Sequence, residues 1–284
     1  MAIPKFQHFI SQMQAKRFTD ENGRFYVYNK RARKVIHTTP KNVFAESHLY
    51  TIENAKGEKD TSLETKFSEL EGVANSIINK IVTVSRSGGK PSLTEEERAN
   101  FDLFFYMQWK RVPDIHAKMK SIQESGSLVD EYFTQLRAKY PEKAAEIDAL
   151  DTPAERKRLL QGGKVRGIET LGQEVLGVLA NRGLVILRIT APGECFAIGS
   201  LPIVRKSGDL RAADSEVWMP VASDIAVGFG GPQNNETLLP IDDPSKVLNI
   251  NRVTAAQSTS FAAVSKDVVE SLAAFSDSAI GTES

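Results

Sequence analysis

The chain has 284 residues, of which 41% are hydrophobic and 25% are charged. This composition is ordinary for a globular protein and supplies enough apolar side chains for a sizeable core. The most apolar stretch, residues 175–191, is interrupted by Arg182 and Arg188, which excludes a membrane span. The first eighteen residues lack the continuous apolar segment of an export signal. Because the single cysteine, Cys195, rules out an intramolecular disulfide, we expect a cytoplasmic protein without membrane contact.

The net charge of zero hides an uneven distribution of charge along the chain. Residues 1–43 contain nine Lys or Arg and two acids, whereas residues 207–284 contain four basic residues and eleven acids. Opposite charges favour packing of these two regions against each other. The alternative is that the basic region faces the phosphates of RNA or DNA. The sequence leaves both interpretations open.

Residues 1–60 are expected to form a β-rich lobe. The β-branched and aromatic runs at 25–28 and 34–38 flank a basic segment, so they predict a hairpin with a basic tip. A further short strand is expected at 48–52, before an exposed loop at 54–60. A hairpin of this size is not stable alone, so we expect it to join or cover the C-terminal sheet.

Residues 61–182 are expected to form a helical region. Apolar residues recur at helical spacing in four segments: 63–84, 94–112, 128–136 and 168–181. Thr61 and Thr94 are each followed three residues later by Glu, which predicts a capping box before the first two helices. Short charged helices should follow Pro141, and the Gly162-Gly163 pair should end that run.

Residues 183–275 are expected to be rich in strands, and residues 276–284 to be a disordered tail. Turn residues separate five short strand candidates: 184–190, 195–198, 203–205, 217–221 and 225–229. A helix at 244–257, a strand at 261–264 and a last helix ending near Phe275 complete the chain. The order of β lobe, helices and strands favours an α+β fold, one composite domain with a mixed or antiparallel C-terminal sheet.

Several short segments occur in a recognisable order. They read His8-Phe9-Ile10-Ser11-Gln12, Lys16-Arg17-Phe18, Gly23-Arg24-Phe25-Tyr26-Val27-Tyr28 and, much later, Gln108-Trp109-Lys110-Arg111-Val112-Pro113. Together they resemble the bacterial family known as domain of unknown function 4238, over nearly the whole chain. The resemblance implies no established activity, so it supports the fold more than the function. Where the family often has Ser-Asp-Asn-Pro, this chain reads Gly199-Ser200-Leu201-Pro202.

Three polar residues are candidates for catalysis. His8 could act as a general base, and Arg17 could hold a phosphate group through its forked donors. Arg111 and His116 have the Arg-x-x-x-x-His spacing that resembles HEPN-type ribonucleases, in which the arginine steadies the phosphate. The favoured hypothesis is a protein that contacts nucleic acid through its N-terminal basic lobe, and a nuclease activity within this hypothesis would use His8, Arg17 and Arg111. The structural alternative is that these residues anchor the N-terminal segment, with Arg111 tied to a carboxylate such as Glu71.

The predicted hairpin tip carries the candidate residues for nucleic-acid binding: Arg24, Lys30, Arg31, Arg33 and Lys34. They could follow the phosphate backbone of RNA or DNA while Tyr26 or Tyr28 stacks on a base. The alternative is a solvated tip without a ligand. The competing function hypothesis is a non-catalytic interaction protein, which includes association into a homo-oligomer. No metal-ligand pattern occurs in the sequence, and no cofactor can be assigned.

Overall fold

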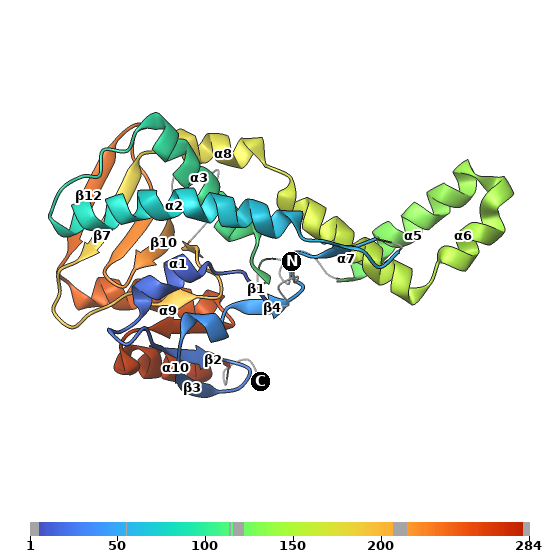
Figure 1. Cartoon of the computed structure of the whole chain (residues 1–284). Helices are drawn as coiled ribbons and strands as arrows, with labels where there is room; N and C mark the ends of the chain where they lie inside the picture. Colours follow the sequence, from blue (N-terminus) through green and yellow to red (C-terminus); the bar gives the residue numbers. More distant parts are fainter. Residues whose placement is uncertain (1–5, 55, 114, 116–121, 207–214, 281–284) are drawn as a thin grey trace.

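The computed structural model describes residues 6–54, 56–113, 115, 122–206 and 215–280. These residues form a body of two main sheets with covering helices, from which a helical arm projects (Figure 1). The expected α+β fold is confirmed. His116 lies outside the described residues.

The larger sheet has five strands in the order β12 (Glu236–Ile241), β7 (Leu184–Ile189), β11 (Ile225–Phe229), β10 (Val217–Ala222) and β9 (Val204–Arg205). β12 and β7 are parallel, and the other neighbours are antiparallel, so the sheet is mixed. The sequence patterns did not predict β12. Pro240 lies inside this strand, and proline is disfavoured in the middle of a sheet, but β12 is an edge strand, which tolerates the missing N–H group of a proline.

The N-terminal hairpin is part of the smaller sheet, whose order is β3 (Lys34–Thr38), β2 (Phe25–Asn29), β13 (Ser260–Ala263) and β8 (Ile198–Gly199). β2 pairs antiparallel with β13, which lies more than 230 positions later in the chain, from Tyr26↔Ala263 to Asn29↔Ser260. The expectation that the hairpin joins C-terminal strands is therefore confirmed. The first strand, β1 (Phe6–His8), pairs separately with β4 (Ala45–Ser47).

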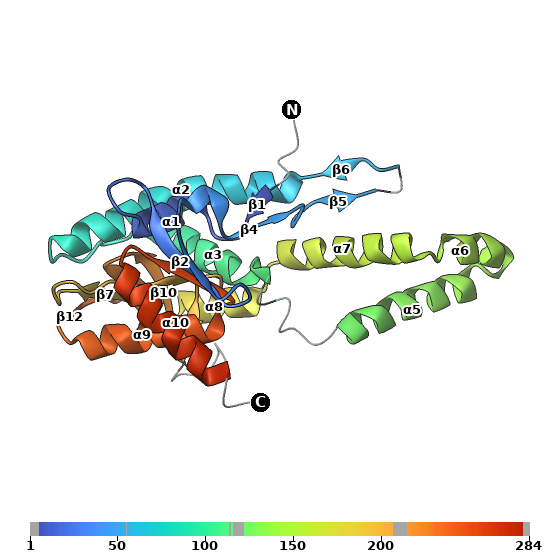
Figure 2. The same cartoon turned by 90° about the horizontal axis from the view of Figure 1, so that it is seen from below.

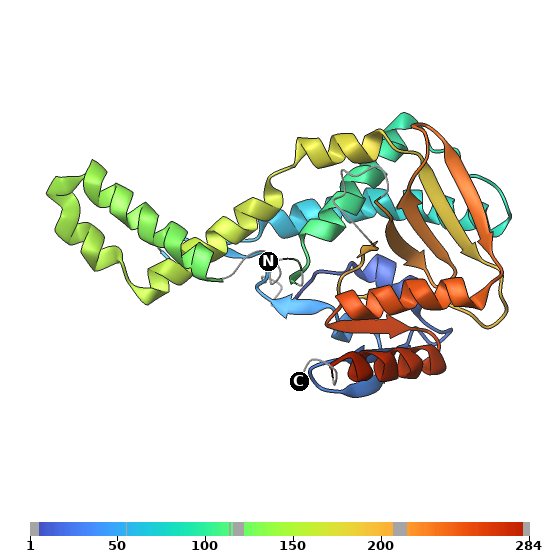
Figure 3. The ribbon, with the colours of Figure 1, turned by 180° about the vertical axis from the view of Figure 1, so that it is seen from behind.

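Helices cover both sheets. α2 (Ser62–Arg86), α3 (Glu95–Lys110) and α8 (Gln173–Ala180) lie on one side of the larger sheet, where Phe105 of α3 meets Phe229 of β11 edge to face at 4.7 Å. α9 (Pro244–Gln257) lies between that sheet and β13, and α10 (Lys266–Ile280) packs beyond it (Figure 3). The capping box at Thr94 is present, whereas Thr61 makes no side-chain cap, so that prediction was wrong.

The arm consists of α5 (Ile122–Lys139), η3 (Pro141–Lys143), α6 (Ala144–Leu150) and α7 (Pro153–Glu169) (Figure 2). It has a small core of its own, made by Val129, Phe133 and Ile147. Ion pairs close the arm around this core, because Arg156 reaches Asp130 at 2.6 Å and Arg137 reaches Asp148 at 2.7 Å.

Two helix boundaries in the prediction were wrong. α7 continues through Gly162 and Gly163, although each glycine costs a helix about 1 kcal/mol relative to alanine. The tertiary structure compensates, since Val165 and Ile168 are buried and Gln161 donates to the carbonyl of Leu49 at 3.0 Å. The helix expected at 168–181 is consequently shorter and begins at Gln173.

The last helix also extends further than expected. α10 runs to Ile280, so the prediction of a disordered tail was wrong for residues 276–280, and residues 281–284 lie outside the described part. The extra turn is held by packing, because Ser276 is buried and Asp277 accepts a hydrogen bond from the Tyr28 hydroxyl at 2.6 Å. Within the described residues, no helix combines the length and apolar character needed to cross a bilayer.

Candidate functional site

Arg111 lies in the interior, with 1% of its surface exposed. Its Nη1 donates to Oε1 of Glu71 at 2.7 Å, its Nε donates to the carbonyl of Phe9 at 2.9 Å, and the guanidinium stacks over the Phe67 ring. The carbonyl of Arg111 in turn accepts the hydroxyl of Tyr50 at 3.0 Å. The structure confirms the ion pair with Glu71 that the structural alternative names. Enclosed in this way, the side chain has no path to a phosphate in solution.

Glu64 adds a second carboxyl group beside this network. Burial raises its pKa above the ordinary value, the charge of Arg111 opposes that shift, and the charge of Glu71 adds to it. Its Oε2 and the Nη2 of Arg111 are both enclosed without a hydrogen-bond partner. The group is thus a buried arginine between two carboxyls, of which only Glu71 makes a direct contact with it.

Arg17 binds the same helix one turn further along. Its Nη2 donates to Oδ1 of Asn75 at 2.7 Å and to Oδ1 of Asn79 at 2.6 Å, and its Nη1 donates to the carbonyl of Met13. These acceptors carry no charge. Burial lowers the pKa of Arg17, and the nearby charge of Arg86 lowers it further. The arginine therefore joins the N-terminal segment to α2 by neutral hydrogen bonds.

His8 lies elsewhere, at the end of β1. Its ring Nε2 is 3.2 Å from the carbonyl of Lys41, and the side chain is half-buried. His8 is on a strand, and the first helix, α1 (Gln12–Ala15), begins four residues later. No ion pair or hydrogen bond of the described residues connects His8 with Arg17 or Arg111. The catalytic hypothesis for these three residues stays a prediction, and their contacts fit the structural alternative.

The basic hairpin tip forms as predicted, between Asn29 and Lys34. Arg31, Arg33 and Lys34 are exposed, and none of them forms an ion pair with a carboxylate of the described chain. Arg24 instead donates to the carbonyl of His37 at 2.6 Å, and Lys30 donates to that of Ala256 at 3.3 Å. Three of the five predicted residues thus present charge to solvent, and two brace the hairpin.

The tip is held from several sides. The carbonyl of Asn29 accepts the N–H of Arg33 at 2.8 Å, and the N–H of Lys30 donates to the carbonyl of Thr259 at 3.0 Å. Tyr28 is 2% exposed with its hydroxyl bound to Asp277, so it is not free to stack on a base. Tyr26 stacks on His37 at 4.4 Å between ring centres. The basic N-terminal region and the acidic C-terminal region do pack together, through β2, β13 and α10. No carboxylate of the described chain pairs with Arg31, Arg33 or Lys34 at the tip.

The cysteine and the potential metal ligands among the described residues form no further catalytic or metal site. Cys195 is buried, which raises the pKa of its thiol, and it packs as a small apolar residue near Phe261 and Val269. Across the ranges that the structure describes, no three His, Cys, Asp or Glu side chains gather as a metal site would require.

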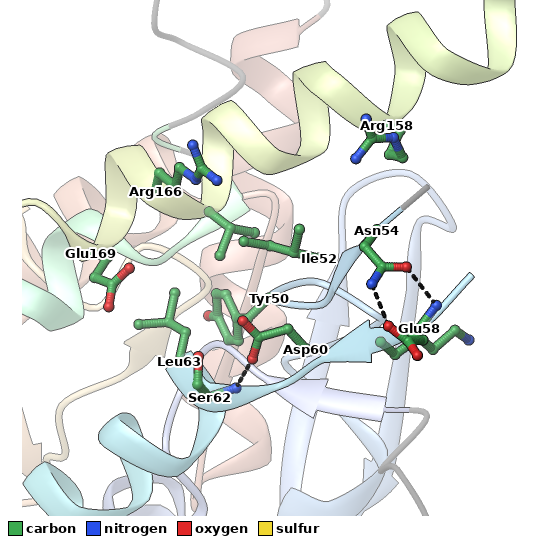
Figure 4. A pocket seen from close by; sticks show the side chains of 12 residues that line it. Tyr50, Ile52, Asn54, Glu58, Asp60, Ser62, Leu63, Arg158, Arg166 and Glu169 are labelled. Atoms are coloured by element: carbon green, nitrogen blue, oxygen red, sulfur yellow. Dashed lines mark hydrogen bonds between the residues drawn. The ribbon is translucent and has the colours of Figure 1, made fainter. Parts of the chain in front are cut away.

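A cavity of about 500 Å³ lies at the base of the arm, between α7, the start of α2 and the hairpin formed by β5 (Ile52–Glu53) and β6 (Lys59–Asp60) (Figure 4). Its apolar surface comes from Tyr50, Ile52, Leu63 and Val165. Charged and polar groups complete the lining: Asn54, Glu58, Lys59, Asp60, Ser62, Arg158, Arg166 and Glu169. Sequence reasoning missed this site. The helical spacing of Arg158, Arg166 and Glu169 was a usable signal, but the glycine pair suggested that the helix had ended.

These features define an α+β protein whose smaller sheet combines strands from both ends of the chain, with a projecting helical arm. Its sequence matches the model of the family described as "Protein of unknown function (DUF4238)" over residues 7–267, and the chain belongs to that family. No curated protein and no solved structure matches it.

Proposed function

We propose that this protein binds nucleic acid through the tip of the β2–β3 hairpin. The observation that supports the proposal is the group of Arg31, Arg33 and Lys34, three exposed cations within four positions that no carboxylate of the described chain neutralises. Because the whole chain has no net charge, the attraction for phosphates is local to this tip. Because the backbone of the hairpin is already braced, little backbone freedom is lost when these cations meet a phosphate backbone, which favours binding.

The expected interaction is electrostatic and tolerant of sequence. Three phosphate contacts give an affinity that falls steeply with salt, with a slope of log K against log salt of about −0.9 per contact on duplex DNA. Tyr26, half-exposed beside His37, is the aromatic side chain placed to add a stacking contact with an unpaired base.

Fluorescence anisotropy with labelled single-stranded RNA, single-stranded DNA and duplex DNA tests this proposal. Replacing Arg31, Arg33 and Lys34 together by Gln should raise Kd at least tenfold and reduce the salt slope by about 2 to 3. The matched control replaces Lys139, Lys143 and Lys157, exposed cations of the arm, by Gln, with the same change in net charge. Equal losses in both variants, or unchanged binding in the tip variant, would reject the tip as the binding surface.

Cleavage is a separate question from binding. Of the three candidate catalytic residues, Arg111 is enclosed and Arg17 is occupied by amide oxygens, so His8 is the group to test first. The labelled strands should be incubated with the protein, with and without Mg²⁺ or Mn²⁺, beside the variant His8→Ala. Cleavage that disappears in this variant, with an unchanged melting temperature, supports a nuclease; binding without cleavage supports a non-catalytic binding protein.

A second candidate function, self-association, is favoured by the arm. Leu128 and Tyr132 lie one turn apart on α5 and are 65% and 47% exposed, although the core of the arm is complete without them. Residues 122–169 contain nine acidic and eight basic side chains, so two arms would not repel each other. An apolar stripe on a nearly neutral projection suits an isologous contact with a second copy of this chain.

Light scattering after size-exclusion chromatography decides this second candidate. We expect a dimer that dissociates when Leu128 and Tyr132 are both changed to Gln. The control is Ala138→Gln, at an exposed position of α5 on the side opposite the arm's core. A monomer at all concentrations would remove self-association from consideration.

A further inference from the structure

His37 and Tyr26 form a stacked pair of rings at the edge of the smaller sheet. They are paired directly opposite each other on β3 and β2, so both side chains leave the same face of the sheet. Their ring centres are 4.4 Å apart, and the ring planes differ by 16°. β3 is an edge strand, so no further strand of the described chain lies beyond His37 (Figure 1). Tyr26 is therefore the inner ring of the pair, and His37 is the outer ring.

The ring of His37 is held in place and is still open to solvent. Its Nε2 is 3.3 Å from Oδ2 of Asp20, while Oδ1 of Asp20 accepts the backbone N–H groups of Asn22 and Arg24, each at 2.9 Å. The turn before β2 thus fixes the carboxylate, and the carboxylate fixes the ring. The His37 side chain nevertheless keeps 35% of its surface exposed. A ring that is already ordered loses little conformational freedom when a planar ligand covers it.

Cations lie on the same hairpin as the stacked pair. Nη2 of Arg24 donates to the carbonyl of His37 at 2.6 Å, which places the guanidinium of this exposed arginine beside the outer ring. Lys34 begins β3 three positions before His37, a separation of about 10 Å along the strand. Lys34 belongs to the tip, whose three charges no described carboxylate neutralises. An aromatic ring next to phosphate-binding cations is the combination by which proteins bind unpaired nucleotides.

We propose that this hairpin binds single-stranded nucleic acid, with one unpaired base stacked on the outer face of His37 and the adjoining phosphates on Arg24 and the tip. The inference rests on the proposed binding of nucleic acid and adds the class of substrate. The carboxylate of Asp20 repels a phosphate at the ring, which leaves the base as the group that contacts it.

The same arrangement discriminates against duplexes. In a duplex, neighbouring base pairs cover both faces of each base, so a base extends the stack of Tyr26 and His37 only after it leaves the helix. Leaving the helix costs a few kcal/mol for a paired base and much less for an unpaired one. Single strands should therefore bind more tightly than duplex DNA, although both meet the same cations.

Two substitutions at position 37 test the stacking contact by fluorescence anisotropy with labelled single strands and a duplex of the same sequence. At pH 8, where an ordinary histidine is neutral, His37→Ala should weaken single-strand binding about fivefold or more and leave duplex binding unchanged. His37→Phe keeps an aromatic ring and should retain the preference for single strands. The control is Ile36→Ala, the next position of β3, whose exposed side chain leaves the opposite face and should not affect Kd.

Proton NMR of the full chain gives a direct readout of the contact. The Hε1 signal of His37, identified by its loss in His37→Phe, should move upfield when a short single strand is added, because the ring current of a stacked base shields it. Melting temperatures confirm that the variants are folded. An unmoved signal in the presence of bound single strand would overturn the stacking contact.

The outcomes separate this inference from the proposed function. Equal affinity for single strands and duplex, or single-strand binding that His37→Ala leaves unchanged, would overturn the inference. If replacement of the tip cations still weakened binding in that case, the proposed function would stand. Equal weakening of single-strand and duplex binding by His37→Ala would also overturn the inference, since stacking acts on unpaired bases alone. If no strand bound at all, both the proposed function and this inference would be wrong.

Discussion

Arg111 and Glu71 form an ion pair 2.7 Å long whose arginine is 1% exposed while its glutamate reaches the surface. The same guanidinium binds the carbonyl of Phe9, so one side chain joins the N-terminal segment, α2 and the end of α3. A cation in this position is costly to desolvate and stays in place because its partners are fixed. The pair therefore stabilises the junction of three segments that are far apart in sequence.

Removing the cation should destabilise the whole fold. We expect Arg111→Met to lower the free energy of unfolding by roughly 3 kcal/mol, because Glu71 and the carbonyl of Phe9 lose their partner. Urea denaturation measures this loss. The control is Lys90→Met, an exposed lysine whose ammonium group has no partner among the described residues, which should change stability by less than about 0.5 kcal/mol. A stable Arg111 variant would show that the arginine has a role other than holding the junction.

Glu64 should make stability depend on pH in a direction unusual for a carboxylate. Because burial raises its pKa in the folded state, its protonated form favours folding, and this contribution is lost as pH rises through the folded pKa. Glu64→Gln should therefore be more stable than the parent chain at pH 7. The difference should vanish below the unfolded pKa of about 4.3. Thermal melts from pH 3 to pH 8 test the sign, and a variant less stable at pH 7 would contradict it.

Arg17 should gain stability from a charged partner. Its acceptors on α2 are neutral amides, so Asn75→Asp would place a carboxylate 2.7 Å away in the position of the present amide oxygen. We expect a gain of about 1 kcal/mol at neutral pH. The new carboxyl should have a lowered pKa, so the gain should disappear as pH falls through that value. Ser76→Asp, at an exposed position of the same helix, is the control, and an equal gain there would indicate a general effect of charge.

The packing around Gly199 excludes a side chain. A Cβ atom on Gly199 would lie 2.1 Å from Oγ of Ser258 and 3.0 Å from a methyl group of Thr254. Gly199→Ser should cost about 1 to 3 kcal/mol. In a double-mutant cycle with Ser258→Ala, the losses in the free energy of unfolding of the two single variants should add to more than the loss of the double variant. Strict additivity would show that Ser258 does not clash with the new side chain at position 199.

Local sequence patterns determined several elements correctly. The helical spacing of apolar residues placed α2 and α3, the segment 244–257 matches α9, and the aromatic and β-branched runs gave the β2–β3 hairpin with its basic tip. The pairing of Arg111 with Glu71 was named as the structural alternative to a catalytic role, because an arginine at a helix end often binds a carboxylate. These features depend on neighbours within a few turns or on the chemistry of one side chain.

Only the tertiary structure decided the remaining features. Burial of Val165 and Ile168 carries α7 through two glycines, an edge position admits Pro240 into β12, and the Tyr28–Asp277 bond extends α10. The cavity likewise exists because α7 lies against the β5–β6 hairpin, which is about a hundred residues earlier in the chain. In each case, contacts between distant segments supply the free energy that outweighs the local conformational preference of the residues. Patterns within a short segment of sequence cannot predict such contacts.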